Sequence, residues 1–179
     1  MEYVMQIKFK EIKTKITLTF SPDVIQHLYS NRQINLDYEV GGQLFARFLA
    51  GGEVLIEKVT GPRDVDSKLR NFFKPDKRIE QQEINTLFKE GYHYLGDWHT
   101  HPEKTPSPSI EDIKNIGNIF RKSRHSLNHF VLVIVGQIAS PDGLYVALHD
   151  GVRIKPCRQL TSIPSQSSSY NTSELNLSV

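Results

Sequence analysis

The chain of 179 residues suits one domain of ordinary size. Its 22 lysines and arginines nearly balance its 20 aspartates and glutamates, so the basic excess typical of nucleic-acid binders is absent. Cys157 is the only cysteine, which excludes an internal disulfide and cysteine-rich zinc sites and favours a reducing compartment. The longest apolar run, 130–135, is far shorter than the roughly 20 residues of a membrane helix, and the start lacks the apolar stretch of a signal peptide. These features predict a soluble cytoplasmic protein with no nucleic-acid or membrane partner.

The first half of the chain reads as strands around one helix. Alternating apolar residues and glycine turns predict strands at 5–9, 15–20, 39–48 and 53–59. Ser21 followed by Pro22 marks a helix start, and the helical spacing fades near 31–33. A polar loop is expected to open at Gly61.

The second half contains two further amphipathic helices. They are expected at 76–90 and 109–124, with strands at 92–101, 128–135, 143–148 and 152–154. Three prolines make 102–108 a loop. Strands and helices interleave without a regular β-α-β repeat, and adjacent strands look hairpin-linked. The pattern therefore favours an α+β (mixed α/β) fold.

Serines dominate the sequence from residue 161 onward, and apolar residues are few. Such a segment buries too little surface to offset its ordering entropy, so 161–179 is expected to be a flexible tail. A tail that orders on a partner is the alternative. The folded domain is expected to cover 1–160.

The most informative stretch for function begins at His99. On a strand, His99 and His101 point the same way, which is the spacing that two imidazoles need to share one metal. Asp112, in the first turn of the next helix, is placed to add a carboxylate. Two imidazoles and one carboxylate leave a fourth position for water, as in catalytic zinc sites.

Each of these residues also has a plain structural interpretation. A histidine pair at this spacing arises readily by chance among seven histidines. Ser109 reads as an ordinary helix N-cap, and Asp112 as an acid favoured by the helix dipole. The joint spacing of all four residues is much rarer by chance, and a capped helix start is compatible with a metal ligand.

The motif His99-x-His101-Pro102 followed by Ser109-x-x-Asp112, with Glu39 upstream, resembles the JAMM (JAB1/MPN+) zinc metalloproteases. The resemblance extends over about 16–135. It implies a mostly antiparallel curved sheet flanked by helices, as in the MPN/JAB fold. It also implies hydrolysis of an amide or isopeptide bond without a covalent intermediate.

By this resemblance, the expected ligands of Zn²⁺ are His99, His101 and Asp112. Glu39 is the expected general base, and Ser109 the expected hydrogen-bond donor to the developing oxyanion. Glu39 has the largest sequence separation, so a place on a solvated strand edge is its structural alternative. Asp37 is a nearby competitor for its role that fits the family spacing less well.

Within the family, the Gly-Asp-Trp-His-Thr-His-Pro context looks most like stand-alone bacterial JAB peptidases, in particular the deconjugating peptidase of antiphage CBASS operons. That resemblance implies a protein substrate with an extended C-terminal tail, released from a conjugate made by ubiquitin-like machinery. The protein released there is a cGAS-like nucleotidyltransferase. Two alternatives stay open: processing of a dedicated bacterial ubiquitin-like or sulfur-carrier protein, and a catalytically inactive MPN scaffold.

Other residues near the motif have less specific interpretations. His93 is expected on the same strand face as His99, where it could support a ligand, and Trp98 is expected in the core. Phe72-Phe73 either closes a buried edge or grips a substrate tail, the first being favoured. A basic stretch reads as a solvated loop or as a docking patch for an acidic partner; it comprises Arg63, Lys68, Arg70, Lys74, Lys77 and Arg78.

Overall fold

The computed structural model describes residues 6–34, 38–69, 72–140 and 142–160. A nine-stranded sheet in the order β10-β9-β8-β7-β3-β4-β2-β1-β11 dominates the fold. Its strands are β1 (Ile7–Lys10), β2 (Thr17–Phe20), β3 (Gly41–Phe48), β4 (Glu53–Val59), β7 (His93–Thr100), β8 (Phe130–Val135), β9 (Leu144–His149), β10 (Ile154–Pro156) and β11 (Arg158–Leu160). The helices are α1 (Pro22–Ser30), η1 (Ala50–Gly52, a single 3₁₀ turn), α2 (Lys77–Lys89) and α3 (Ile110–Lys122).

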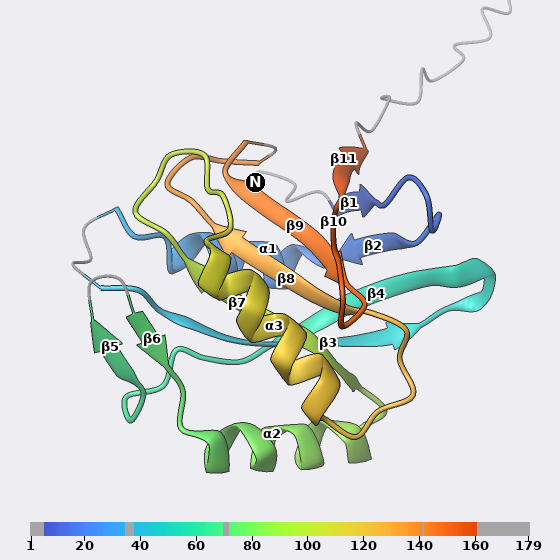
Figure 1. The fold of residues 1–179 in the computed structure, drawn as a ribbon, viewed down its shortest axis with the longest axis horizontal. Coiled ribbons are helices and arrows are strands. Elements are labelled where there is room, and N and C mark those ends of the chain that lie inside the picture. The colour runs from blue at the N-terminus through green and yellow to red at the C-terminus, as the bar shows by residue number, and fades with distance from the viewer. Residues whose placement is uncertain (1–5, 35–37, 70–71, 141, 161–179) are drawn as a thin grey trace, which may run out of the picture.

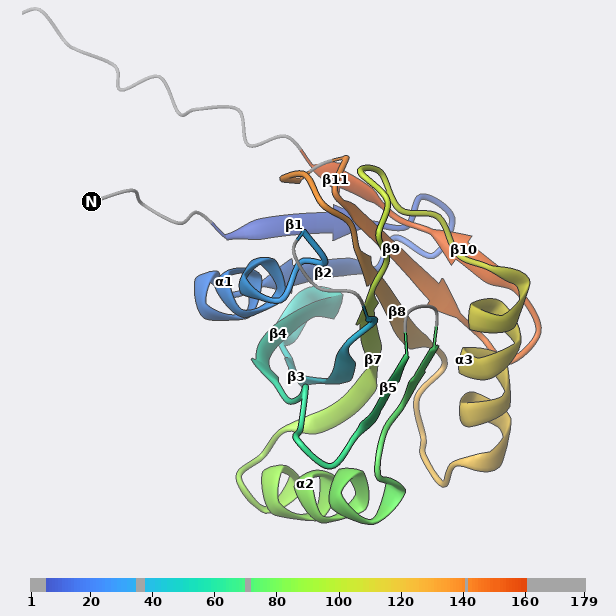
Figure 2. The ribbon, with the colours of Figure 1, turned by 90° about the vertical axis from the view of Figure 1, so that its left-hand side faces the viewer.

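The sheet is curved and mostly antiparallel, which confirms the expected α+β class (Figures 1 and 2). Two neighbouring pairs are parallel: β2 with β4, and β7 with β8. The second pair is connected through α3, so the chain returns to the sheet beside the strand that it left. This connection brings the first turn of α3 to the end of β7, where the histidine pair lies.

Helices cover both faces of the sheet, and each face has its own apolar core. The larger core joins α1 to one face through Val24, Ile25 and Leu28, all at most 2% exposed. The smaller core joins α3 to the opposite face through Ile116 and includes Phe130 of β8. Figure 2 shows α1 and α3 on opposite sides of the sheet, with α2 at one end beside β7.

Within the described ranges, α1, α2 and α3 each begin at a side-chain cap, and the caps at Ser21 and Ser109 were expected from the sequence. The hydroxyl of Ser21 accepts a hydrogen bond from the N–H of Val24, and the carboxylate of Asp76 accepts one from the N–H of Arg78. Ser109 caps α3. Such caps satisfy N–H groups that have no partner within the helix, and this explains why the predicted helix starts are confirmed.

Three short strands were not predicted. β5 (Ser67–Leu69) and β6 (Phe72–Lys74) pair as a separate hairpin inside the expected polar loop, and β11 pairs with β1. Each has only three residues, too few to show an alternating pattern. The expected strand at 152–154 was also misplaced: it starts at Ile154, because the Asp150 carboxylate holds Val152 and Arg153 in a turn.

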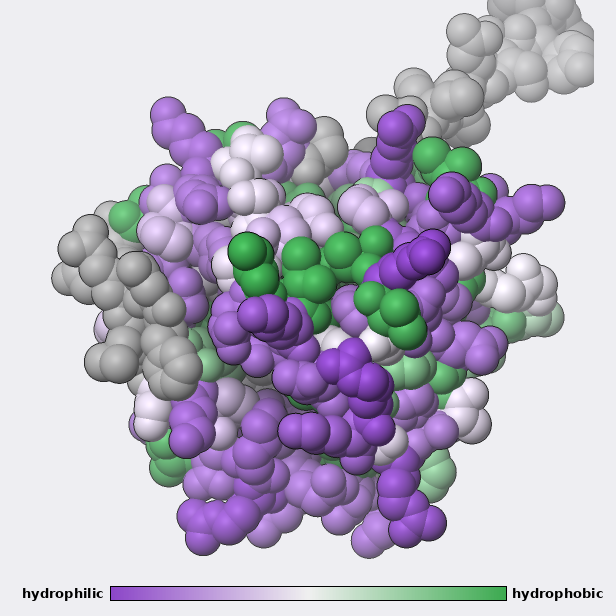
Figure 3. All heavy atoms as spheres, viewed as in Figure 1, coloured by the Kyte–Doolittle hydropathy of each residue, from purple (hydrophilic) through white to green (hydrophobic). Residues whose placement is uncertain are grey.

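The face that carries α3 is predominantly hydrophilic, with a smaller group of hydrophobic side chains near its centre (Figure 3). Across the described residues, every helix is too short or too polar to span a bilayer. The expected tail at 161–179 lies outside the described residues.

Candidate metal centre

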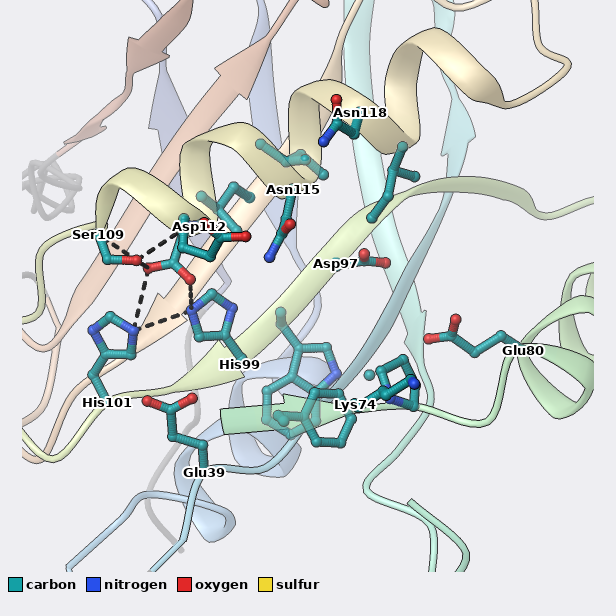
Figure 4. Close-up of a pocket in the computed structure, with 18 of the residues that line it drawn as sticks. Glu39, Lys74, Glu80, Asp97, His99, His101, Ser109, Asp112, Asn115 and Asn118 are labelled. Carbon is teal, nitrogen blue, oxygen red and sulfur yellow. Dashed lines mark hydrogen bonds and ion pairs between the residues drawn. The ribbon is translucent and has the colours of Figure 1, made fainter. Parts of the chain in front are cut away.

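His99 and His101 turn their imidazole rings to the same side of the sheet (Figure 4). His99 lies on β7. His101 follows the end of β7 and stays paired with β8, because its N–H donates a 2.9 Å hydrogen bond to the carbonyl of Val135. The Nε2 atoms of the two rings are 3.2 Å apart. Both side chains are largely buried, at 13% and 11% exposed. The strand alternation therefore aims two nitrogen donors at one point.

Asp112 reaches the same point from α3. Ser109 and Asp112 form a capping box, in which the Ser109 N–H donates to Oδ2 of Asp112 at 2.7 Å and the Asp112 N–H donates to the Ser109 hydroxyl oxygen at 3.1 Å. The Asp112 carboxylate lies 3.2 Å from Nε2 of His99 and 3.4 Å from Nε2 of His101. One ligand atom from each of these three residues fits within a 4.8 Å cluster.

The charges of this cluster are strongly coupled. Burial alone would raise the pKa of Asp112, but hydrogen bonds with His101, His99 and Ser109 outweigh it and hold the pKa well below its usual range. Burial alone would lower the pKa of His101, yet the contact with Asp112 and the negative charge of Glu39 raise it. The site thus holds an ionised carboxylate against nitrogen donors, which is a set of groups that suits a divalent cation.

Glu39 lies two residues before β3, and its carboxylate faces both imidazoles (Figure 4). It is half-buried, so the alternative place on a solvated strand edge does not describe it. Burial raises the pKa of Glu39; the neighbouring imidazoles oppose that rise and Asp112 adds to it. The predicted strand at 39–48 begins instead at Gly41, which leaves Glu39 outside the ladder. The competing Asp37 lies outside the described residues.

Glycines let the chain that follows Glu39 pack tightly against its neighbours. A Cβ atom at Gly42 would lie 1.8 Å from the carbonyl oxygen of Thr60, and one at Gly41 would lie 2.5 Å from that of Trp98. The indole N–H of Trp98 donates to the same Thr60 carbonyl at 2.9 Å. Only residues without a Cβ fit this backbone approach, as their sequence indicated.

A pocket of about 1000 Å³ contains the site. One wall is α3, which contributes Asn115 and Lys122. Lys74 of β6 lies on the opposite side (Figure 4), and Phe73 of the same strand also lines the pocket. Phe73 is half-buried and exposed to this pocket, and the side chain of Phe72 is not described. The pocket therefore extends along α3 from the histidines and offers both polar and apolar contacts.

Two carboxylates that sequence reasoning missed lie on the pocket floor. Asp97 accepts a 2.7 Å hydrogen bond from the hydroxyl of Tyr94, and Glu80 of α2 is paired with Lys77 at 2.8 Å. Burial raises the pKa of both Asp97 and Glu80, and the Asp97 charge adds to the rise at Glu80. The available signal was that Asp97 precedes His99 by two residues on one strand.

His93 does not share the face of His99, contrary to the expectation from strand alternation. Leu95 is an extra residue on β7, because Leu44 and Phe45 of β3 pair with Gly96 and Tyr94. This bulge shifts the alternation by one residue. His93 consequently lies at the surface, between the rings of Phe48 and Phe88.

Trp98 and Cys157 were both expected to lie outside the reaction chemistry. Trp98 is buried in the core at 1% exposed, as predicted. The thiol of Cys157 is far from nucleophilic, since burial raises its pKa to about 12.

Three of the six basic residues of this stretch form ion pairs within the described part of the chain. Arg63 pairs with Glu83 and Asp66, Lys77 with Glu80, and Arg78 with Asp76. Lys74 lines the pocket, and Arg70 and the side chain of Lys68 are not described. These ion pairs show that Arg63, Lys77 and Arg78 already have acidic partners within the chain.

Known proteins are similar to this chain in sequence, and a solved structure is similar to it in fold. Residues 21–147 match the family described as prokaryotic homologs of the JAB domain. A relative from Escherichia coli (strain TW11681), named CD-NTase/cGAS isopeptidase, is 35% identical over 97 residues, which are 52% of this chain and 62% of that protein. A relative from Sinorhizobium fredii, named probable metalloprotease y4qB, is 27% identical over 103 residues, which are 55% of this chain and 63% of that protein.

A solved structure supports the fold alone. A protein from Desulfitobacterium hafniense, 18% identical, superposes with a TM-score of 0.58 over 78% of this chain and 88% of that one. The matched region spans less than two thirds of the E. coli and S. fredii relatives. The family match covers most of this chain and includes Glu39, His99, His101 and Asp112. The chain therefore belongs to the prokaryotic JAB-domain family of JAMM-type peptidases.

Proposed function

We propose that the protein is a zinc-dependent isopeptidase that cleaves the C-terminal linkage of a protein conjugated by ubiquitin-like machinery. The observation that carries this proposal is the convergence of His99, His101 and Asp112, with the Glu39 carboxylate facing them. The released protein is a cGAS-like nucleotidyltransferase. Several relatives named CD-NTase/cGAS isopeptidase support that substrate.

The donor set fits zinc. Two imidazole nitrogens and one carboxylate oxygen form the three-ligand arrangement of catalytic zinc, which leaves a position for water. His99, His101 and Asp112 would hold the ion. When bound, it supplies Lewis-acid polarisation of the scissile carbonyl and lowers the pKa of water.

Glu39 is the proposed general base. Its carboxylate takes a proton from the attacking water and passes it to the departing amine. A carboxylate serves best when its pKa lies closer to the working pH, and burial raises the pKa of Glu39 in that direction. The half-buried position also limits competing hydrogen bonds from solvent.

Ser109 is the proposed donor to the oxyanion. Its hydroxyl now donates to Oδ2 of Asp112 at 2.7 Å. We propose that this donated bond turns to the carbonyl oxygen as negative charge develops there. The capping box holds the serine backbone in place, so only the hydroxyl needs to turn.

The pocket along α3 is the proposed binding site for the substrate tail. An extended peptide offers N–H and C=O groups that Asn115 can bind and side chains that Phe73 can contact. We assign the enzymatic domain to 1–160 and the reaction to the cytoplasm, where the free thiol of Cys157 remains reduced.

The test uses two substrates. One is a nucleotidyltransferase extended at its C-terminus by a short peptide, and the other a ubiquitin-like protein with the same extension. Mass spectrometry should locate cleavage at the first junction, and a chelator should abolish it. Cleavage of the ubiquitin-like protein alone would contradict the substrate assignment and favour processing of a dedicated ubiquitin-like or sulfur-carrier protein. Cleavage of neither, by protein that binds zinc, would favour the inactive scaffold.

A further inference from the structure

Thr100 lies between the two histidines in sequence but faces the opposite side of the sheet. His99 and His101 point into the pocket, whereas Thr100 points into the protein and is 0% exposed. A buried hydroxyl must find hydrogen-bond partners, because leaving it unpaired carries a desolvation cost. Its partners in this structure identify what it holds.

Two hydrogen bonds join Thr100 to Val40, the residue that follows Glu39. The N–H of Thr100 donates to the carbonyl of Val40 at 2.9 Å, which extends the ladder between β7 and β3 by one residue. The N–H of Val40 donates to the hydroxyl oxygen of Thr100 at 3.1 Å. The hydroxyl of the Thr100 side chain accepts this second bond. It therefore holds Val40 just before β3, which begins at Gly41.

The bond to the Val40 N–H has a direct consequence for Glu39. That N–H belongs to the peptide unit that also contains the Glu39 carbonyl and bears its Cα atom. The peptide unit is planar, so a hydrogen bond that holds its N–H restricts the orientation of the whole unit. The Thr100 hydroxyl thereby restricts the direction in which the Glu39 side chain leaves the backbone.

The Thr100 hydroxyl is itself oriented by a second buried side chain, that of Gln33. Its hydrogen is directed to the side-chain oxygen of Gln33, 3.4 Å away and 3% exposed. The backbone carbonyl of Gln33 accepts a 3.0 Å hydrogen bond from the side chain of Gln137. With its hydrogen directed to Gln33, the hydroxyl oxygen presents its lone pairs to Val40.

We propose that Thr100 is a positioning residue for the reaction, one that holds the segment bearing Glu39 at a fixed distance from the strand bearing the metal ligands. This inference rests on the proposed function, since it concerns the general base of that reaction. The same residue sits between both ligands and bonds to the residue after the base. A shift in either segment therefore moves the other.

The first test replaces Thr100 with valine, which keeps the shape and removes the hydroxyl. Thr100→Val should lower kcat roughly 10- to 100-fold, as expected when a catalytic group is misplaced by about 1 Å. KM should change less than about twofold, because the pocket walls are untouched. Thr100→Ser keeps the hydroxyl and should restore kcat to within a few-fold of the wild type. The bound zinc content should be the same in all three proteins.

Thr19→Val is the matched control. Thr19 is also on a strand, is 1% exposed, and donates its hydroxyl to Glu53 away from the pocket. It should lose stability comparably and keep its kcat. An equal loss of kcat in Thr19→Val, or a wild-type kcat in Thr100→Val, would overturn the proposal.

The second test does not depend on activity. Amide hydrogen exchange, measured by NMR on metal-free protein, should show the Val40 N–H protected in the wild type and in Thr100→Ser. The protection should fall at least tenfold in Thr100→Val, or in Thr100→Ala if the valine variant does not fold. Unchanged Val40 protection would overturn the proposal. A wild type that cleaves no substrate would overturn the proposed function, while the exchange result would still decide whether Thr100 holds this segment.

Discussion

Ser109 and Asp112 form a capping box in which the carboxylate that accepts the Ser109 N–H also faces two imidazoles at 3.2 and 3.4 Å. The bonds that start α3 therefore also orient the carboxylate of Asp112, a proposed metal ligand. The structural and the chemical interpretations of these two residues describe the same hydrogen bonds, so each residue should carry two separable effects.

Replacing Ser109 with alanine should produce both effects. Loss of the cap should lower the free energy of unfolding by about 1 kcal/mol. Loss of the proposed oxyanion donor should lower kcat roughly 10²- to 10³-fold. Chemical denaturation and steady-state kinetics measure the two quantities independently.

Ser21→Ala is the control for this prediction. Ser21 caps α1 through the Val24 N–H, so its loss should destabilise the fold similarly while leaving kcat unchanged. If Ser109→Ala lost only stability, Ser109 would be a cap and nothing more.

The fold class and the cluster of His99, His101 and Asp112 were predictable because their signals are local. Strand alternation determines that His99 and His101 share a face, and a cap residue marks where the helix bearing Asp112 starts. The glycines after Glu39 indicated a close backbone approach, which the carbonyl of Thr60 makes.

The features that were missed depend on contacts between distant segments. The bulge at Leu95, which removes His93 from the site, is visible only in the pairing of β7 with β3. Glu80 lines the same pocket as Asp97 because α2 packs against β7, and no sequence spacing encodes that approach. The β5–β6 hairpin has three-residue strands, which are too short to show a period.

Glu39→Gln should lower kcat roughly 10²- to 10⁴-fold, because glutamine keeps the shape of the side chain but cannot take a proton. Zinc content should not change, since Glu39 is not among the proposed ligands. The exposed Glu90, at the end of α2, provides the control: Glu90→Gln should behave as the wild type. A Glu39→Gln variant with substantial turnover would require another base.

Asp97→Asn should stabilise the protein at neutral pH. Burial raises the pKa of Asp97 above the ordinary value of 3.8, so the folded state binds a proton more tightly than the unfolded state. The wild type therefore loses stability as the pH rises from the ordinary pKa through the raised one. Asparagine carries no charge and can still accept the Tyr94 bond. The difference in unfolding free energy between variant and wild type should shrink as the pH falls toward 4.

Asp76→Asn should show the opposite sign. Hydrogen bonds from Arg78 lower the pKa of Asp76, so its stabilising effect is present above the ordinary pKa and is lost as the pH falls through the lowered one. This variant should be less stable than the wild type at neutral pH and converge with it in acid. A parallel pH dependence of the two variants would contradict the charge assignment at Asp97.

We propose that His99, His101 and Asp112 hold one zinc ion for hydrolysis, and native mass spectrometry of zinc-supplied protein tests this assignment most directly. The wild type, Glu39→Gln and His93→Ala should each carry one zinc ion per chain, and His101→Ala should carry none. A wild type that binds no zinc, or a His101→Ala variant that retains it, would contradict the assignment.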